Sequence, residues 1–137
     1  MKKYYLFCTV FIFLAGCSLS QKEKNISVIE SNKKHTSNTD TVICDEFQIN
    51  TKDVEEYFLY AEKLDPQEFH NQSILFSCNY SGRLIRNGKI YNWEIYPAGA
   101  GYIFNENITE NYQCDSKNCP NSILGITEKN TDYQSQK

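Results

Sequence analysis

Residues 83–95 read RLIRNGKIYNWEI, two runs of strand-forming residues on either side of Asn87-Gly88. Asn-Gly is the strongest short signal for a two-residue hairpin turn, because a type I′ turn needs positive φ at both central positions. A turn here pairs Arg86 with Lys89 and fixes the register of the strands. Gly82 then lies opposite Trp93 and leaves room for the indole, which we expect to be the main anchor of the core. The side chains predicted to share one buried face are Leu84, Tyr91, Trp93 and Ile95.

The sequence around this hairpin predicts one helix and further strands. Asn50 has the side chain of an N-cap, Asp53 follows three residues later, and Asp65-Pro66 ends the helix. Its apolar positions at helical spacing are Val54, Tyr57, Phe58, Ala61 and Leu64. Strand patterns occur over 41–44, 74–80, 102–104 and 108–114. The prediction is an α+β fold, in which one amphipathic helix packs on a small antiparallel β-meander of about four strands stapled by disulfides.

The amino terminus has the parts of an export signal. Met1-Lys2-Lys3 is positive, and residues 6–14 are apolar but too short to span a bilayer. The tetrapeptide Leu14-Ala15-Gly16-Cys17 resembles the lipobox of bacterial lipoproteins position for position. The resemblance covers the first 17 residues. It implies cleavage before Cys17 and acyl chains on that residue; an ordinary signal peptide is the alternative interpretation.

The resemblance also implies an address. Ser18, and not aspartate, follows Cys17, which in lipoproteins of two-membrane bacteria implies sorting to the outer membrane. The domain would then lie in the periplasm, anchored to the membrane through the lipid on Cys17. In an organism with a single membrane, the lipid on Cys17 would anchor the protein to the cell membrane.

These features divide the chain into four parts. We expect a lipoprotein signal peptide over 1–16, a lipidated cysteine and disordered tether over 17–40, a single α+β domain over 41–126, and a frayed tail over 127–137. The tether has too few apolar side chains to offset the entropy of ordering it. Those between residues 18 and 40 are Leu19, Ile26, Val28 and Ile29.

The charge of the mature chain limits its partners. The sequence has 14 basic and 17 acidic residues, and the signal removes Lys2 and Lys3, so the mature protein carries a net charge of −5. An acidic surface disfavours nucleic acid and anionic headgroups and favours a cationic protein partner. Solubility alone is the other interpretation of this charge.

Four cysteines remain after Cys8 leaves with the signal and Cys17 is acylated: Cys44, Cys78, Cys114 and Cys119. In an exported protein they predict two disulfides, with three possible pairings. The close spacing of Cys114 and Cys119 favours that pair and leaves Cys44 for Cys78. A four-cysteine zinc site is the rival interpretation.

The sequence has little of the pattern of a catalytic site. His35 and His70 are the only histidines, and His70 beside Glu68 is the sole acid/base candidate. There is no phosphate-binding loop, metal-spaced histidine pair or nucleophile elbow. We therefore expect no catalytic residues, no metal, no cofactor and no enzymatic activity.

The candidate binding residues are surface residues of two kinds. Tyr96 and Tyr102 flank a short segment of proline, alanine and glycine, and Glu55, Glu56 and Glu62 give the helix an acidic side. We expect a non-catalytic envelope lipoprotein that binds a protein in the periplasm, as an inhibitor or immunity protein against a cationic hydrolase or toxin. The alternative is a structural or accessory lipoprotein of an envelope assembly. No nucleic-acid partner is expected.

Overall fold

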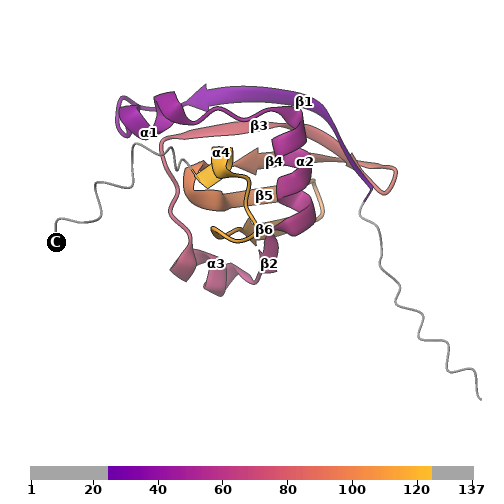
Figure 1. The fold of residues 1–137 in the computed structure, drawn as a ribbon. Helices are drawn as coiled ribbons and strands as arrows, with labels where there is room; N and C mark the ends of the chain where they lie inside the picture. Colours follow the sequence, from indigo (N-terminus) through magenta and orange to yellow (C-terminus); the bar gives the residue numbers. More distant parts are fainter. Residues whose placement is uncertain (1–24, 125–137) are drawn as a thin grey trace, which may run out of the picture.

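The computed structural model describes residues 25–124, which form a six-stranded antiparallel sheet with short helices packed on it (Figure 1). The elements in chain order are β1 (Ile26–His35), α1 (Thr41–Glu46), α2 (Thr51–Tyr60), β2 (Glu62–Leu64), α3 (Pro66–Gln72), β3 (Cys78–Arg86), β4 (Lys89–Ile95), η1 (Pro97–Gly99), β5 (Ala100–Phe104), β6 (Thr109–Gln113) and α4 (Asn121–Leu124). The strand order is β1-β3-β4-β5-β6-β2, so β1 and β2 are the edges. The proposed signal peptide, Cys17 and the tail 127–137 lie outside the described residues.

No helix within residues 25–124 combines the length and the apolar character needed to cross a membrane.

The predicted fold of one helix on about four strands is wrong in both its helices and its strand count. Strands β3-β4-β5-β6 do form a meander, but β1 and β2 extend the sheet at its edges. Helix α2 ends at Tyr60, because Ala61 has extended backbone angles of φ −61° and ψ 140°. Leu64 therefore leaves the helical stripe and lies in β2. Asp65 caps α3 instead, accepting hydrogen bonds from the amides that follow Pro66.

Strand β1 occupies part of the segment that the sequence predicted to be a disordered tether. It pairs with the whole of β3, from Ile26 opposite Arg86 to His35 opposite Cys78. An edge strand needs few apolar side chains, because its backbone hydrogen bonds satisfy the main chain on one side. The residues 41–44, predicted as a strand, form most of α1.

Gly82 is required by the backbone of β1 and not by the indole of Trp93. A bulge between Val28 and Glu30 brings the main chain of β1 close to Gly82. A Cβ atom added at Gly82 would overlap the carbonyl oxygen of Glu30. The space beside Gly82 that was predicted to hold the indole is therefore filled by the backbone of β1.

Gly82→Ala is expected to lower the free energy of unfolding by about 1–3 kcal/mol and to loosen β1, because the clash is with backbone. Gly88→Ala is the matched control. Nothing lies within 4 Å of a Cβ there, so only the positive φ is strained, at about 1 kcal/mol. Hydrogen exchange would report faster opening of β1 than of β4 in Gly82→Ala. Unchanged exchange in β1 would contradict the prediction.

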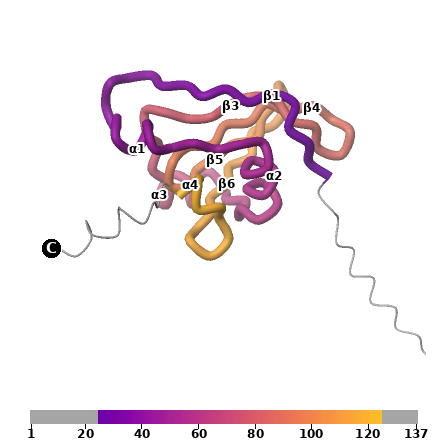
Figure 2. Tube along the Cα trace, turned by 45° about the horizontal axis from the view of Figure 1, so that its top comes forward, coloured from indigo at the N-terminus to yellow at the C-terminus, as the bar shows by residue number. Residues whose placement is uncertain are grey.

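Helix α2 has the predicted N-terminus and crosses the strands of the sheet (Figure 1, Figure 2). The Asn50 side chain accepts a hydrogen bond from the Asp53 amide at 3.1 Å, and the Asp53 carboxylate accepts one from the Asn50 amide at 3.0 Å. This capping box satisfies two amides at the start of the helix. Val54, Tyr57 and Phe58 are the buried side chains that α2 turns towards the sheet.

The register of the β3–β4 hairpin is confirmed. Arg86 lies opposite Lys89, Leu84 opposite Tyr91 and Gly82 opposite Trp93. The predicted face of the hairpin is buried and belongs to the main core cluster, with Trp93 fully enclosed. A second, smaller cluster lies on the opposite face of the sheet beside α3, because residues of opposite parity in β5 face opposite sides. Its members are Leu64, Phe69 and Ala100, with Tyr96 and Tyr102 packed against them.

Candidate functional site

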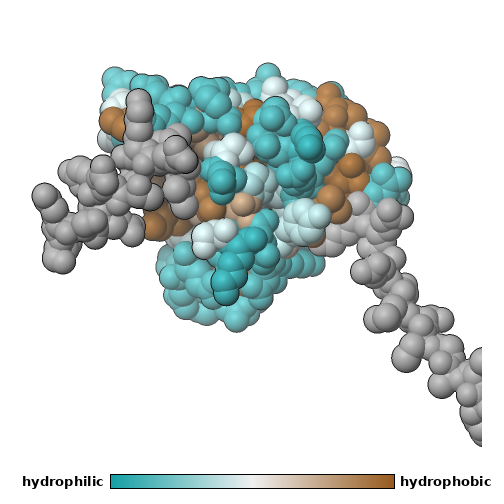
Figure 3. Space-filling model, viewed as in Figure 1, coloured by the Kyte–Doolittle hydropathy of each residue, from teal (hydrophilic) through white to brown (hydrophobic). Residues whose placement is uncertain are grey.

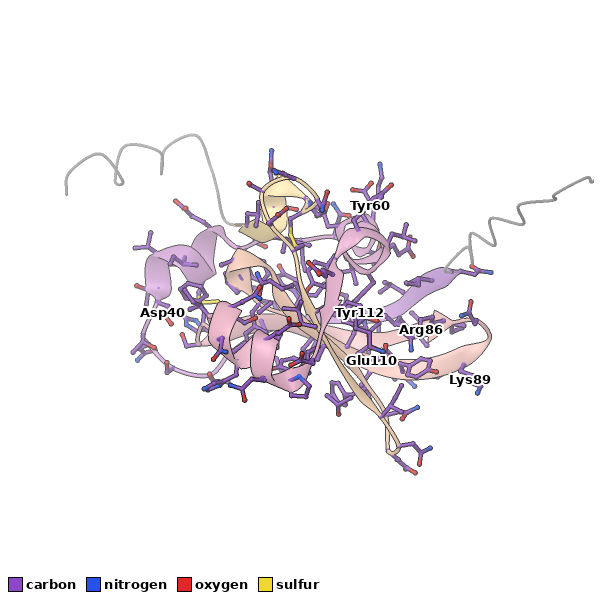
Figure 4. The ribbon with its side chains drawn as sticks, turned by 90° about the horizontal axis from the view of Figure 1, so that it is seen from below. Asp40, Tyr60, Arg86, Lys89, Glu110 and Tyr112 are labelled. Carbon is purple, nitrogen blue, oxygen red and sulfur yellow. A yellow bond between two sulfur atoms is a disulfide. The ribbon has the colours of Figure 1, made fainter. Side chains whose placement is uncertain are left out.

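A groove with a volume of about 530 Å³ lies where the β3–β4 hairpin meets β6 and β2. We call it the Arg86 groove, and its lining residues are Lys63, Arg86, Asn87, Lys89, Tyr91, Glu110 and Tyr112. The strand register places the lining side chains of the strands on the same face of the sheet as α2, since Arg86 is opposite Lys89 and Lys63 is opposite Tyr112. Figure 4 shows Arg86, Glu110 and Tyr112 close together, with Lys89 further out along the hairpin.

Arg86 lies at the centre of a hydrogen-bonded network. Its Nη1 donates to Glu110 Oε2 at 2.5 Å and to the Tyr112 hydroxyl at 3.2 Å. The guanidinium also lies over the ring of Tyr91, with 4.6 Å between Cζ and the ring centroid. The Tyr112 hydroxyl donates to Glu110 Oε2 at 2.8 Å, and Lys63 Nζ donates to Oε1 at 2.8 Å. Both oxygens of Glu110 are therefore occupied, and the network holds the groove in one shape.

Three groups of this network, Arg86, Glu110 and Tyr112, have shifted pKa values and keep one charge state around neutral pH. Burial alone would raise the pKa of Glu110, but hydrogen bonds from Arg86, Lys63 and Tyr112 outweigh it and lower the pKa to about 2. Burial and the hydrogen bond to Glu110 raise the pKa of Tyr112 to about 12. Burial opposes the charge of Arg86, but hydrogen bonds with Glu110 and Tyr91 raise its pKa above the ordinary value. None of Glu110, Tyr112 and Arg86 is therefore poised to exchange a proton near pH 7.

Glu110→Gln is expected to remove a part of the stability that depends on pH. Because the folded-state pKa is lowered from 4.5 to about 2, this contribution is complete above pH 4.5 and is lost as the pH falls towards 2. We expect the free energy of unfolding of the variant to be lower than that of the wild type by about 1–2 kcal/mol at neutral pH. This loss lies between those typical of breaking exposed and buried ion pairs. Urea unfolding at a series of pH values measures it, with the exposed Glu106→Gln as control. A wild-type slope below pH 4.5 in Glu110→Gln would contradict the prediction.

The Arg86 groove is lined by more cationic than anionic side chains, although the protein as a whole is acidic. Its lining includes three cationic side chains, Lys63, Arg86 and Lys89, and one carboxylate, Glu110. Within residues 25–124, Lys89 has no ion-pair partner. A guanidinium with two ammonium groups suits the oxygens of a phosphate or carboxylate. The sequence did not reveal this site, because Glu110 is 24 residues from Arg86 and only the sheet register brings them together.

Tyr96 and Tyr102, the predicted flanks of a binding loop, lie in the second core cluster. Their ring centroids are 6.2 Å apart, and the Tyr102 ring is 4.9 Å from that of Phe69. The Tyr96 hydroxyl donates to Glu94 Oε2 at 2.9 Å. The segment between the tyrosines is mostly buried and includes the turn η1, so it is not the bendable exposed loop that its composition suggests. Binding through this segment stays a prediction.

The three acidic candidates do not form one cluster. Glu55 accepts a hydrogen bond from the Val28 amide at 3.1 Å and so covers the edge of β1. Glu56 forms an ion pair with Lys52 at 3.7 Å on α2, and Glu62 is exposed in β2. Their roles in binding also stay predictions.

Two large apolar side chains that lie between Glu56 and Glu62 in the sequence are exposed to solvent. Leu59 is 44% exposed and Tyr60 is 63% exposed at the end of α2. Figure 4 shows Tyr60 on the helix, apart from the residues of the Arg86 groove. Neither residue is among the predicted core positions of the helix, and nothing in the sequence pattern marks the pair as a binding surface.

The predicted disulfides are confirmed as Cys44–Cys78 and Cys114–Cys119. The bonded sulfurs cannot act as thiolate ligands, so the rival zinc site is excluded. No group of three or more histidine, cysteine, aspartate or glutamate residues within 25–124 is arranged to hold a metal. His70, the acid/base candidate, is exposed in the last turn of α3.

Comparison with protein-family models, with curated proteins and with solved structures finds no match to this chain.

Proposed function

We propose that this chain is a lipid-anchored, non-catalytic protein-binding module of the inhibitor or immunity type, and that its partner is a cationic protein. The observation that carries the proposal is the exposed pair Leu59 and Tyr60 on α2, with the carboxylates of Glu56 and Glu62 nearby in the sequence. Exposed tyrosines are enriched among residues that dominate binding energy, and acidic neighbours steer a cationic partner towards them.

The scaffold beneath this pair supports a binding role because it is fixed before any partner arrives. The Tyr57 hydroxyl donates to the carbonyl oxygens of Gly99 at 2.8 Å and Tyr112 at 3.1 Å, and so ties α2 to the sheet. The Phe58 ring makes an edge contact with the Tyr112 ring, with 5.5 Å between centroids. A surface that is already ordered loses less entropy on binding.

The partner is tested with the mature chain, residues 17–137, carrying Cys17→Ala, immobilised and exposed to envelope and secreted fractions. The proposal expects a basic protein to be retained, with an affinity that falls as salt rises. With the purified partner, Tyr60→Ser and Glu56→Lys should each weaken binding at least tenfold, an effect of about 1.4 kcal/mol or more. Ile74→Ser is the matched control, because Ile74 is as exposed as Tyr60 and lies outside α2.

The outcome also separates the two kinds of function. An envelope component that binds equally well to wild type and to both α2 variants would contradict the inhibitor proposal and favour an accessory role. Loss of binding in Ile74→Ser, with no loss in Tyr60→Ser, would show that another surface is used.

The anchor is tested separately from the partner. Wild-type protein should enter the detergent phase on phase separation and show the added mass of acyl chains on Cys17. Cys17→Ala made as the mature chain, residues 17–137, should remain in the aqueous phase. Entry of Cys17→Ala into the detergent phase would contradict the lipobox interpretation.

A further inference from the structure

We propose that the end of the sheet carrying the Arg86 groove lies against the membrane and that the groove binds the phosphates of anionic lipid headgroups. This inference rests on the proposed lipid anchor at Cys17. It assigns a ligand and an orientation that the anchor alone does not give.

The first argument is the place where the chain enters the fold. The Asn25 carbonyl accepts a hydrogen bond from the Asn87 amide at 3.1 Å, and Ile26 lies opposite Arg86. The start of β1 is therefore beside the β3–β4 turn (Figure 1). Only residues 18–24 separate Cys17 from Asn25, and a chain of that length spans at most about 27 Å. The groove is thus at the end of the domain that a lipid on Cys17 would hold close to the bilayer.

The second argument is the chemistry of the groove. Phosphate oxygens accept hydrogen bonds from guanidinium and ammonium groups, and Arg86, Lys63 and Lys89 supply both. Glu110 does not present a free carboxylate to the headgroup, because donors occupy both of its oxygens. Tyr91 contributes an apolar ring and Tyr112 a polar hydroxyl to the lining of the groove. Tyrosines, which combine an apolar ring with a polar hydroxyl, are enriched at membrane interfaces.

Exposed isoleucines lie at the same end of the sheet as the groove. Ile90 follows the hairpin turn and is 57% exposed, Ile29 lies at the bulge of β1, and Ile108 ends the β5–β6 turn. Figure 3 shows hydrophobic surface gathered over the start of β1 and the hairpin. Apolar side chains mixed with lysine and arginine are typical of surfaces that lie in the headgroup region.

The orientation leaves the proposed protein-binding surface accessible. Helix α2 crosses the strands, so when the strand ends at the hairpin face the membrane, the helix lies along the side of the domain (Figure 1, Figure 2). Each basic residue near an anionic surface strengthens binding only about fivefold. The anchor makes this weak attraction sufficient to orient the domain, because it holds the groove at high effective concentration near the lipid.

Binding is tested first without the anchor or the signal, using the mature chain (residues 17–137) with Cys17→Ala and vesicles of phosphatidylcholine with or without phosphatidylglycerol. Co-sedimentation with the anionic vesicles and not with the neutral ones is expected, and it should weaken as salt rises. Lys89→Glu should weaken it at least tenfold, and Ile90→Ser should also weaken it. Glu106→Gln should strengthen it, since this exposed carboxylate lies in the β5–β6 turn at the same end.

The matched controls are at the opposite end of the sheet. Lys117→Glu lies beyond the end of β6, and Ile74→Ser precedes the start of β3. If Lys117→Glu weakened vesicle binding as much as Lys89→Glu, or if neutral vesicles bound equally well, the proposal would be overturned.

The orientation is tested next in the acylated protein inserted into the same vesicles. An amine-reactive reagent should modify Lys89 less than Lys117 on anionic vesicles, with the difference reduced on neutral ones. Equal modification of the two lysines on anionic vesicles would overturn the orientation while leaving the anchor intact. Absence of an acyl mass on Cys17 would instead remove the anchor, and the vesicle experiment with Cys17→Ala would still decide whether the groove binds lipid.

Discussion

Trp93→Ala is expected to lower the free energy of unfolding by about 3–5 kcal/mol, which is a large part of the stability of a small domain. Trp93 is 0% exposed in the central strand β4, where it lies opposite Gly82 on one side and Ile103 on the other. The Phe58 ring packs edge-on to the indole from α2, with 6.5 Å between centroids. Removing the indole leaves a cavity between helix and sheet that no neighbouring strand can close, because both flanking strands are paired on their far sides.

Trp93→Phe is the matched variant that separates packing from hydrogen bonding. The indole Nε1 has no hydrogen-bond partner within the described part of the chain, so phenylalanine loses volume and no hydrogen bond. We expect it to cost much less than alanine, about 1–2 kcal/mol. Urea unfolding followed by circular dichroism measures both variants, because Trp93 is the only tryptophan and both remove the fluorescent probe. A loss below 1 kcal/mol in Trp93→Ala would show that the core does not depend on this side chain.

The sequence predicted those parts of the fold that depend on neighbouring residues. Asn87-Gly88 set the turn and the register of β3 and β4, because positive φ at both positions excludes most other pairs. Asn50 and Asp53 predicted the start of α2, because the two residues of a capping box lie within four positions of one another. In both cases the signal and the structure share one short stretch of chain.

The parts that were predicted wrongly depend on residues far apart in the sequence. Strand β1 is too polar to be recognised alone, and it forms because β3 offers a partner for its backbone. The end of α2 was placed too late because Leu64 continues the helical spacing, although it packs in the second cluster with Phe69. Tertiary contacts override a periodic pattern in each of these places.

The candidate site was missed for a related reason. Arg86 and Lys89 are visible in the hairpin sequence, but a cationic pair beside a turn is usually solvated. Their importance comes from Glu110 and Tyr112, which the β4–β5 and β5–β6 pairings bring to the same face. The groove has three cationic side chains and one carboxylate although the whole chain is acidic, so net charge alone does not describe the charge of this groove.

The second large effect is expected from the Cys44–Cys78 disulfide. The bond closes a loop with a sequence separation of 34 and joins α1 to the start of β3. On the chain-entropy model, a loop of that length stabilises the fold by about 4 kcal/mol. The loop contains α2, β2 and α3, so the bond restricts a long, mixed part of the unfolded chain. Cys44→Ala with Cys78→Ala is therefore expected to remove about 4 kcal/mol.

Cys114→Ala with Cys119→Ala is the matched control, because its disulfide closes a loop with a sequence separation of only 5. The same model gives about 2 kcal/mol for that loop, so the longer loop should matter about twice as much. Urea unfolding of the two double variants, followed by the emission of Trp93, compares them directly, since both keep the tryptophan. Hydrogen exchange in the Cys44–Cys78 variant should rise most in α1. Cys44 is the buried residue of this helix, so the helix loses its contact with the core when the disulfide is removed. Equal losses in the two variants would show that the restriction of the unfolded chain is not what these bonds contribute, and that packing of the half-cystines in the core decides their effect instead.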